Sequence, residues 1–249
     1  MKGLGAEKIV STGEAAAASS RWAGAATFLR KVRRRALRDT FGRWAMSRSY
    51  RRVWIDVGAH EGETTFPFAA ADPTLLVYAF EPNLQAASRI MGRLRNYVVL
   101  PIAIAERDGS AELHLTAYEQ SSSLLPADEG GLKSWVSEQE FKVVGSVTVP
   151  TMRLDTFLNG AGIRAVEFLK IDAQGLDLEV AKSAGARLKD VAKVQLEATT
   201  VSYRQYEGAP GKSVIVDYME SMGFRLAGEE SQTHGQEANL TFLRTGGQR

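Results

Sequence analysis

Four acidic side chains follow four apolar segments of this chain, at points where strands are predicted to end. They are Asp56, Glu81, Asp172 and Glu197, and a third predicted strand brings Ala103 to the same edge. The carboxyl ends of parallel strands meet at one edge of a sheet, and ligands of open α/β sheets bind there. Carboxylates at that edge can accept hydrogen bonds from ribose hydroxyls, attract a cation or remove a proton from a hydroxyl.

The turn from Asp56 to Gly62 carries several acids and two glycines. Gly58 and Gly62 let the chain turn sharply and let a ligand approach the backbone. The turn departs from the G-x-G-x-x-G pattern of dinucleotide sites, because His60 and Glu63 stand where the second and third glycines would be. Its acids would repel a diphosphate and attract the sulfonium and ammonium of S-adenosylmethionine. We therefore predict S-adenosylmethionine as the cofactor.

Each strand-end acid has a predicted role. Glu81 is assigned to the ribose hydroxyls, with helix capping as the alternative. Asp172 and Glu197 are the candidate general bases; cofactor positioning is the alternative for Asp172, and a capped loop or a salt bridge is the alternative for Glu197. Together these two could hold Mg²⁺, but no ligand cluster supports this and no metal site is predicted. The predicted cofactor-binding residues are Asp56, Gly58, His60, Gly62, Glu81 and Ala103.

Alternating strand and helix patterns must position these residues. Apolar runs predict buried strands at 53–57, 75–80, 97–105, 166–171 and 191–196. Helical spacing predicts helices at 64–71, 84–94, 153–158, 176–184 and 213–222. Further segments predict strands at 112–116, 143–149, 224–227 and 238–244, a polar loop at 121–131 and a helix at 133–139. The alternation predicts an α/β fold with a mostly parallel sheet, and the final strand pair predicts an antiparallel edge strand.

Composition divides the chain into a basic leader and an acidic domain. The 249 residues include no cysteine, which excludes disulfides and thiolate chemistry. Residues 1–50 are predicted to be a flexible Ala- and Arg-rich leader with a basic helix, and residues 51–249 the main domain. The leader is expected to contact an anionic membrane surface or the acidic domain; an organelle transit peptide is the alternative. Nucleic acid is not expected, because the acidic domain would repel phosphates.

Five segments and one strand-end acid carry a resemblance to a known family. They are Trp54-Ile-Asp-Val-Gly-Ala-His-Glu-Gly62, Tyr78-Ala-Phe-Glu-Pro82, Leu154-Asp155, Leu169-Lys-Ile-Asp-Ala-Gln-Gly-Leu-Asp-Leu-Glu-Val180, Glu197 and Asn239-Leu-Thr-Phe-Leu-Arg244. On these segments the chain resembles the FkbM-type methyltransferases, which often carry Glu at the position of Gln174. The resemblance implies a class I methyltransferase (Rossmann-like) fold with seven strands. It also implies methylation of oxygen on sugars of glycolipids or lipo-oligosaccharides, or on polyketide hydroxyls.

The leading hypothesis is therefore a cytoplasmic methyltransferase that acts on a hydroxyl of a glycoconjugate sugar. A polyketide or another small secondary metabolite is the alternative acceptor. Two other classes stay open: an NAD-dependent oxidoreductase, which the acidic turn disfavours, and a scaffold that binds cofactor without turnover. The loop at 121–131, with Tyr118 and Trp135 near its ends, is expected to cover the acceptor, a surface loop with core aromatics being the alternative. His114 and His234 are predicted to be structural. Nothing in the sequence specifies an oligomeric state.

Overall fold

The computed structural model describes residues 50–136 and 138–246. The predicted leader falls outside this part of the chain except for Tyr50, so its helix and its membrane contact stay predictions. Within the described ranges, no helix combines the length and the apolar character needed to cross a bilayer.

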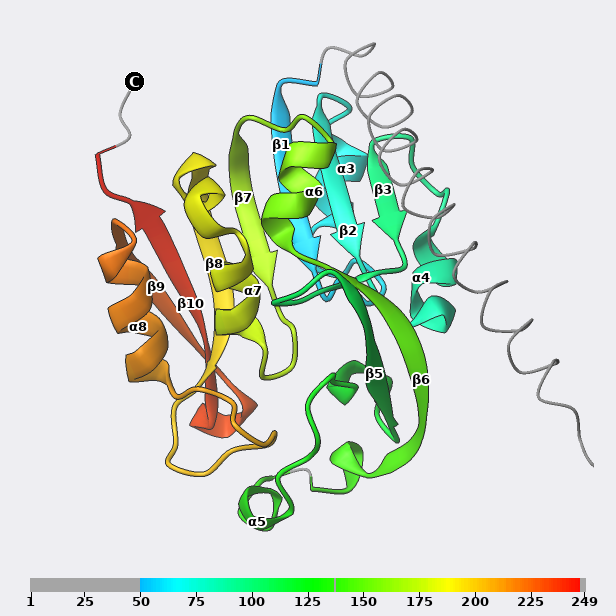
Figure 1. The fold of residues 1–249 in the computed structure, drawn as a ribbon, viewed down its shortest axis with the longest axis vertical. Helices are drawn as coiled ribbons and strands as arrows, with labels where there is room; N and C mark the ends of the chain where they lie inside the picture. The colour runs from blue at the N-terminus through cyan, green and yellow to red at the C-terminus, as the bar shows by residue number, and fades with distance from the viewer. Residues whose placement is uncertain (1–49, 137, 247–249) are drawn as a thin grey trace, which may run out of the picture. The chain divides into compact units, whose positions relative to one another are not determined.

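A seven-stranded sheet with the order β3-β2-β1-β7-β8-β10-β9 positions the predicted strand ends (Figure 1). Its strands are β1 (Arg52–Val57), β2 (Leu75–Phe80), β3 (Tyr97–Leu100), β7 (Val166–Ile171), β8 (Val191–Thr199), β9 (Phe224–Gln232) and β10 (Glu237–Arg244). Strands β3, β2, β1, β7 and β8 are parallel, whereas β10 pairs antiparallel with both β8 and β9. The predicted fold class is confirmed, and the antiparallel pairing lies at the predicted end of the sheet.

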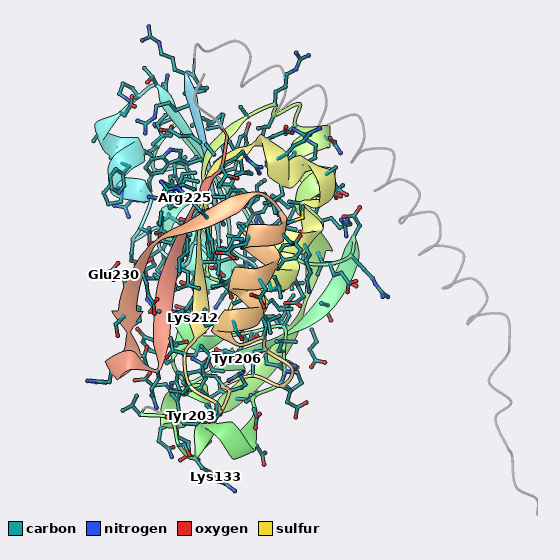
Figure 2. All side chains as sticks on the ribbon, turned by 90° about the vertical axis from the view of Figure 1, so that its left-hand side faces the viewer. Lys133, Tyr203, Tyr206, Lys212, Arg225 and Glu230 are labelled. Atoms are coloured by element: carbon teal, nitrogen blue, oxygen red, sulfur yellow. The ribbon has the colours of Figure 1, made fainter. Side chains whose placement is uncertain are left out.

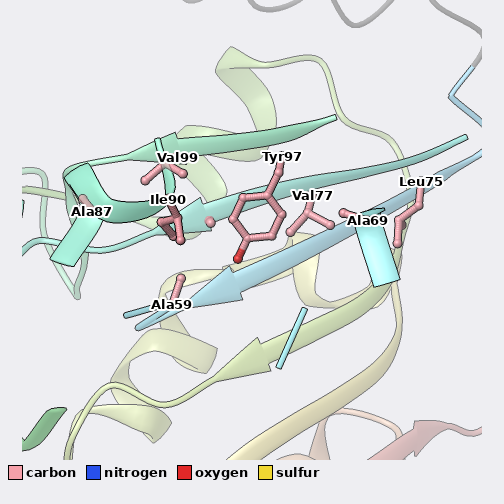
Figure 3. Packing of buried hydrophobic residues seen from close by; sticks show 9 residues of the cluster. Ala59, Ala69, Leu75, Val77, Ala87, Ile90, Tyr97 and Val99 are labelled. Carbon is pink, nitrogen blue, oxygen red and sulfur yellow. The ribbon is translucent and has the colours of Figure 1, made fainter. Parts of the chain in front are cut away.

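Helices cover both faces of this sheet, and β2 shows the effect on sequence. Leu75, Val77 and Ala79 pack with residues of α3 (Phe66–Ala71) and α4 (Leu84–Ile90) (Figure 3). On the opposite face, Tyr78 and Phe80 contact Phe157 of α6 (Leu154–Gly160), with ring centroids 5.1 and 4.8 Å apart. Helices α7 (Asp177–Ser183) and α8 (Lys212–Ser221) lie on the same side as α6 (Figure 1). A strand buried on both faces must be apolar throughout instead of alternating.

The segment 97–105, predicted as one strand, is divided between two sheets. Strand β3 ends at Leu100, and β4 (Ala103–Ile104) belongs to a three-stranded sheet of order β4-β6-β5 with β5 (Gly109–Thr116) and β6 (Val143–Met152). Pro101 separates the two strands and has no N–H to continue the ladder. The backbone turns there, because Ile102 donates from its N–H to the carbonyl of Leu100 at 2.8 Å. Strands β5 and β6 extend beyond the carboxyl ends of β1, β2 and β7 (Figure 1). These two strands and the described residues that connect them are here called the arm.

The helix predicted at 133–139 is wrong. The chain instead forms α5 (Glu129–Leu132), a turn, and the 3₁₀ helix η3 (Glu138–Phe141). Helix α5 begins inside the predicted loop because Asp128 caps it. The Asp128 side chain accepts a hydrogen bond from the N–H of Gly131 at 2.9 Å. The other 3₁₀ helices among the described residues are η2 (Glu119–Ser121), η4 (Gly185–Asp190) and η5 (Thr233–Gly235).

Candidate active site

A cavity of about 530 Å³ opens at the carboxyl ends of β1, β2 and β7, where the strand order predicts a ligand site. The loop after β1, the end of β2, the loop after β7 and parts of the arm form its walls. This volume lies within the usual range for small-molecule and cofactor sites.

Acidic side chains dominate the cavity walls. They are Glu63, Glu81, Glu119, Glu140, Asp172, Glu197 and Glu237. Among the described residues that line the cavity, Lys170 is the sole lysine or arginine, and His60 is the sole histidine. A diphosphate would meet repulsion here, whereas a ligand with a sulfonium and an ammonium would meet attraction. The acidic lining of the cavity therefore fits S-adenosylmethionine better than a dinucleotide.

Glu81 presents a fixed carboxylate at the edge of the cavity. Its oxygens accept hydrogen bonds from the backbone N–H groups of His60 and Asn83, both at 2.8 Å, and the residue is 7% exposed. Burial raises the pKa of Glu81 above its ordinary value, although these hydrogen bonds oppose the effect. Capping of α4 falls to Asn83, whose side chain accepts from the N–H of Gln85 at 3.0 Å. The remaining lone pairs of Glu81 suit a pair of ribose hydroxyls.

Asp56 lies beneath the cavity and does not line it. It is fully buried; Thr65 Oγ1 donates to its Oδ2 at 2.5 Å, and Lys170 Nζ lies 3.2 Å from its Oδ1. Gly62 is also outside the lining and packs against Tyr97 and Phe66. Of the six predicted cofactor-binding residues, the structure therefore brings four to the cavity: Gly58, His60, Glu81 and Ala103.

Lys170 joins the first loop to the loop after β7. Its ammonium donates to the carbonyl of Gly58 at 2.6 Å and lies 3.2 Å from Asp56 and 3.5 Å from Asp172. Burial lowers the pKa of Lys170, but the attraction of Asp56, Asp172 and Asp177 outweighs it and raises this pKa above its ordinary value. Lys170 belongs to one of the segments that carry the family resemblance, but no role was predicted for it. A lysine within a buried apolar strand was the available signal, because a buried charge requires partners.

Asp172 follows β7 and is the partly open carboxylate of this group. Its side chain is 37% exposed, and Gln174 Nε2 donates to its Oδ1 at 2.8 Å. Its backbone carbonyl lies so close to Gly58 that a Cβ at position 58 would stand 1.8 Å from the oxygen. The other predicted catalytic residue, Glu197, also lines the cavity and lies within β8, two residues before the strand ends.

Burial changes the acid–base properties of Glu197 and its neighbour Asp177. Burial, followed by the charge of Asp172 and other acids, raises the pKa of Glu197 well above its ordinary value. Burial raises the pKa of Asp177 to about 7, although its carboxylate accepts hydrogen bonds from the N–H groups of Glu197 and Ala173 at 3.1 and 3.4 Å. Glu197 therefore keeps its proton to a higher pH than an ordinary glutamate does. In the part of the chain that is described, no three His, Asp or Glu residues form a group that could hold a metal ion.

A family model described as the methyltransferase FkbM domain matches residues 56–226. The chain belongs to the FkbM methyltransferase family. It is a methyltransferase whose cofactor is S-adenosylmethionine, as the acidic turn and the resemblance predict.

The chain is also similar to individual proteins. The 2-O-methyltransferase NoeI of Sinorhizobium fredii is 26% identical over 181 residues, which cover 68% of this chain and 71% of NoeI. Among solved structures, TrmK of M. capricolum has a TM-score of 0.44 at 7% identity and covers 84% of this chain and 68% of its own. Precorrin-6y C5,15-methyltransferase of Geobacter metallireducens has a TM-score of 0.43 at 12% identity and covers 83% and 88%.

In this FkbM methyltransferase, Glu119 of the arm contacts His60 in the loop after β1 and two residues at α4. Its carboxylate accepts hydrogen bonds from Asn83 Nδ2 at 2.9 Å and from the guanidinium of Arg89, and lies 3.4 Å from His60 Nε2. His60 Nδ1 lies 2.6 Å from Glu63. Burial lowers the pKa of His60, but these two glutamates outweigh burial and raise the pKa above its ordinary value. Glu119 was not predicted as a site residue, because 59 residues separate it from His60.

The structure also places the remaining aromatic residues and histidines that the sequence singled out. Tyr118 lines the cavity, whereas Trp135 is buried with Phe141 away from it. His114 lies on β5, the edge strand of the small sheet, as predicted, and His234 lies in η5. Neither histidine lines the cavity.

The raised pKa of Glu197 predicts a pH-dependent stability in this methyltransferase. The folded protein binds this proton more tightly than the unfolded chain does, so the contribution of Glu197 to stability is greatest below pH 4.5, the ordinary pKa, and falls as pH rises. Glu197→Gln removes this titration. We expect its free energy of unfolding to gain on that of the natural protein above pH 4.5, at no more than about 1.4 kcal/mol per pH unit. Urea unfolding of both proteins at pH 4 to 8 measures the difference, and a constant difference across this range contradicts the prediction.

Proposed function

We propose that this FkbM methyltransferase transfers the methyl group to a hydroxyl oxygen of a sugar in a glycolipid, lipo-oligosaccharide or other glycoconjugate. The 2-O-methyltransferase activity named for NoeI supports an oxygen acceptor. The single observation that carries the proposal is the Asp172 carboxylate, which lines the cavity and stays partly exposed. A polyketide or other small-metabolite hydroxyl is the second candidate, and the acceptor assay below separates the two.

The cavity residues divide into a cofactor group and a catalytic group. Bound S-adenosylmethionine supplies a methyl group on a positively charged sulfur. We assign Glu81 to the binding of the ribose hydroxyls. Gly58 and His60 are assigned to the loop after β1, whose backbone contacts the cofactor. Ala103, which packs in the apolar cluster of the small sheet, is assigned to contact with the adenine. Asp56 supports the loop from beneath through Thr65 and Lys170 without contact to the cavity.

Asp172 is assigned as the general base. A sugar hydroxyl is a weak nucleophile, so removal of its proton contributes roughly a hundredfold or more to the rate. Lys170 Nζ lies 3.5 Å from Asp172 Oδ2 and holds this carboxylate at the cavity wall. Glu197, which lines the cavity and has a raised pKa, is assigned as a hydrogen-bond partner of the acceptor.

The test uses the full chain and isotopically labelled S-adenosylmethionine. We expect label to appear in a glycolipid or lipo-oligosaccharide pool, with a mass gain of one CH₂ on a sugar. Label in polyketide hydroxyls alone would support the second candidate and overturn the first. Cofactor binding without labelled product in any pool would favour a scaffold, and tighter binding of NAD than of S-adenosylmethionine would overturn the cofactor group.

Glu81→Ala is expected to weaken S-adenosylmethionine binding by roughly ten- to a hundredfold, because hydrogen bonds to a carboxylate contribute about 1.5–3 kcal/mol. Isothermal titration calorimetry measures the affinity. Glu140→Ala is the matched control, since it removes a lining glutamate for which no side-chain contact supports a ribose role. Equal affinities of the two variants would remove Glu81 from the cofactor group.

A further inference from the structure

We propose that Gln174 and Tyr206 are positioning residues for Asp172, joined to it in a hydrogen-bonded chain that runs from the Tyr206 hydroxyl through the Gln174 amide to the carboxylate. This inference rests on the proposed function, because it assumes that Asp172 acts as the base. Gln174 occupies the position where the family resemblance leads us to expect Glu.

The chain is continuous in the structure. The Tyr206 hydroxyl lies 2.6 Å from Gln174 Oε1, and Gln174 Nε2 lies 2.8 Å from Asp172 Oδ1. Tyr206 belongs to the loop between β8 and α8, and Figure 2 places it below α8 on the side toward α5. The three residues therefore link this loop to the loop after β7.

The donor and acceptor roles in this chain are determined by chemistry. An ionised Asp172 only accepts hydrogen bonds, so the amide nitrogen of Gln174 must face it and the amide oxygen must face Tyr206. The Tyr206 hydroxyl has one proton and two acceptors within reach, Gln174 Oε1 and the carbonyl of Ser121 at 2.9 Å. Donation to Gln174 keeps the amide in this orientation, whereas a flipped amide would place its oxygen against the carboxylate.

Contacts with Ser123 and with Tyr206 hold the backbone around Gln174 in an uncommon conformation. Its φ is +52°, a left-handed value that costs a residue with a side chain roughly 1 kcal/mol or more. Ser123 Oγ of the arm donates to its carbonyl at 2.7 Å. A Cβ on Gly175 would stand 2.9 Å from the Tyr206 ring, so the loop is pressed against this tyrosine. Strained conformations persist only where the surroundings determine them.

Tyr206 stays a proton donor throughout the working range of pH. It is 2% exposed, and burial, followed by the charges of Glu237, Glu197, Asp172 and Asp177, raises the pKa of Tyr206 well above its ordinary value. These acids lie on β10, on β8, on α7 and in the loop after β7. Together with Lys170 of β7 they are the charged groups around the hydrogen-bonded path from Tyr206 to Asp172. An uncharged amide next to Asp172 therefore adds a donor without adding another charge.

The test compares kcat, the KM for S-adenosylmethionine and the pH profile of kcat in three variants of the full chain. Tyr206→Phe and Gln174→Ala should lower kcat by roughly ten- to a hundredfold, the loss of one hydrogen bond to a charged group, with the KM for S-adenosylmethionine within about twofold. Gln174→Glu places a second acid beside Asp172, so its acidic limb should move to higher pH, with activity recovering in alkaline buffer.

Tyr203→Phe is the matched control. Tyr203 lies in the same aromatic cluster, and its hydroxyl accepts from Gln236 Nε2 at 2.7 Å instead of contacting the loop after β7. We expect its kcat and pH profile to match those of the natural protein. Equal effects of Tyr203→Phe and Tyr206→Phe, or an unshifted pH profile of Gln174→Glu, would overturn the inference.

The inference and the proposed function fail in different ways. An active Asp172→Asn would show that Asp172 is not the base and would overturn the positioning roles, whereas labelled product on a sugar would still support the proposed acceptor. An inactive Asp172→Asn together with natural kcat values in Tyr206→Phe and Gln174→Ala would overturn the positioning roles alone.

Discussion

Asp172→Asn is expected to lower kcat by roughly a hundredfold to ten-thousandfold, because asparagine keeps the shape of the side chain and cannot take up the hydroxyl proton. Cofactor affinity should change by no more than about threefold, since Glu81 and the first loop are unaltered. Lys170 loses one acidic neighbour and keeps Asp56 at 3.2 Å, so the loop after β1 stays anchored. Single-turnover transfer of labelled methyl, with separate calorimetry of cofactor binding, measures the two quantities.

Asp217→Asn provides the control, because Asp217 is exposed on α8 and lies outside the cavity lining. Its kcat should equal that of the natural protein. If Asp172→Asn retains kcat within about fivefold while Glu197→Gln loses activity, the base is Glu197 and the assignment of Asp172 is wrong.

Gly58→Ala is expected to destabilise the fold by more than about 3 kcal/mol and to abolish cofactor binding. The φ of +70° at Gly58 costs an alanine roughly 1–2 kcal/mol. The larger effect comes from the Cβ position, 1.8 Å from the carbonyl oxygen of Asp172, because this neighbour is backbone and cannot rotate away. Separation of the two loops would also break the hydrogen bond from Lys170 to the carbonyl of Gly58.

Gly92→Ala is the control that separates the conformational cost from the effect of the close approach. Gly92 has a φ of +76°, and a Cβ there meets no atom within 4 Å, so it pays the conformational cost alone. Urea unfolding of both variants should show the smaller loss for Gly92→Ala, with cofactor affinity unchanged. Equal losses would mean that the approach of the two loops does not contribute to stability.

The main sheet was predictable from sequence because its central strands are buried on both faces. Strand β2 was predicted at its observed bounds, 75–80, and β7 at 166–171. The error at 97–105 arose because the apolar residues on both sides of Pro101 form one run, and the missing N–H of the proline outweighs that continuity. The helix predicted at 133–139 failed because Trp135 and Phe141 bury their rings from short turns instead of one helical face.

The candidate site was predictable where it depends on strand ends and less so where it depends on register. Glu81 and Asp172 line the cavity because each directly follows a parallel strand, whereas Glu197 lies inside β8, which runs to Thr199 and so beyond its predicted end at 196. Asp56 and Lys170 are direct partners in the β1–β7 pairing, which explains their ion pair and could not be derived from either strand alone. Glu119 and Tyr206 come from distant segments, and only the folded chain brings them to the site.

The arm has a consequence for how this enzyme can change over evolutionary time. Its strands pair with each other and with β4, and in the described ranges no strand of the small sheet belongs to the seven-stranded sheet. Its residues nonetheless form part of the cavity wall, from Leu113 to Leu124. Mutations in the arm can therefore remodel one wall of the cavity without altering the register that holds Asp172 and Lys170. Selection for new acceptors can therefore act on one contiguous stretch of the gene, provided that Glu119 and Ser123, which contact His60 and Gln174, are retained.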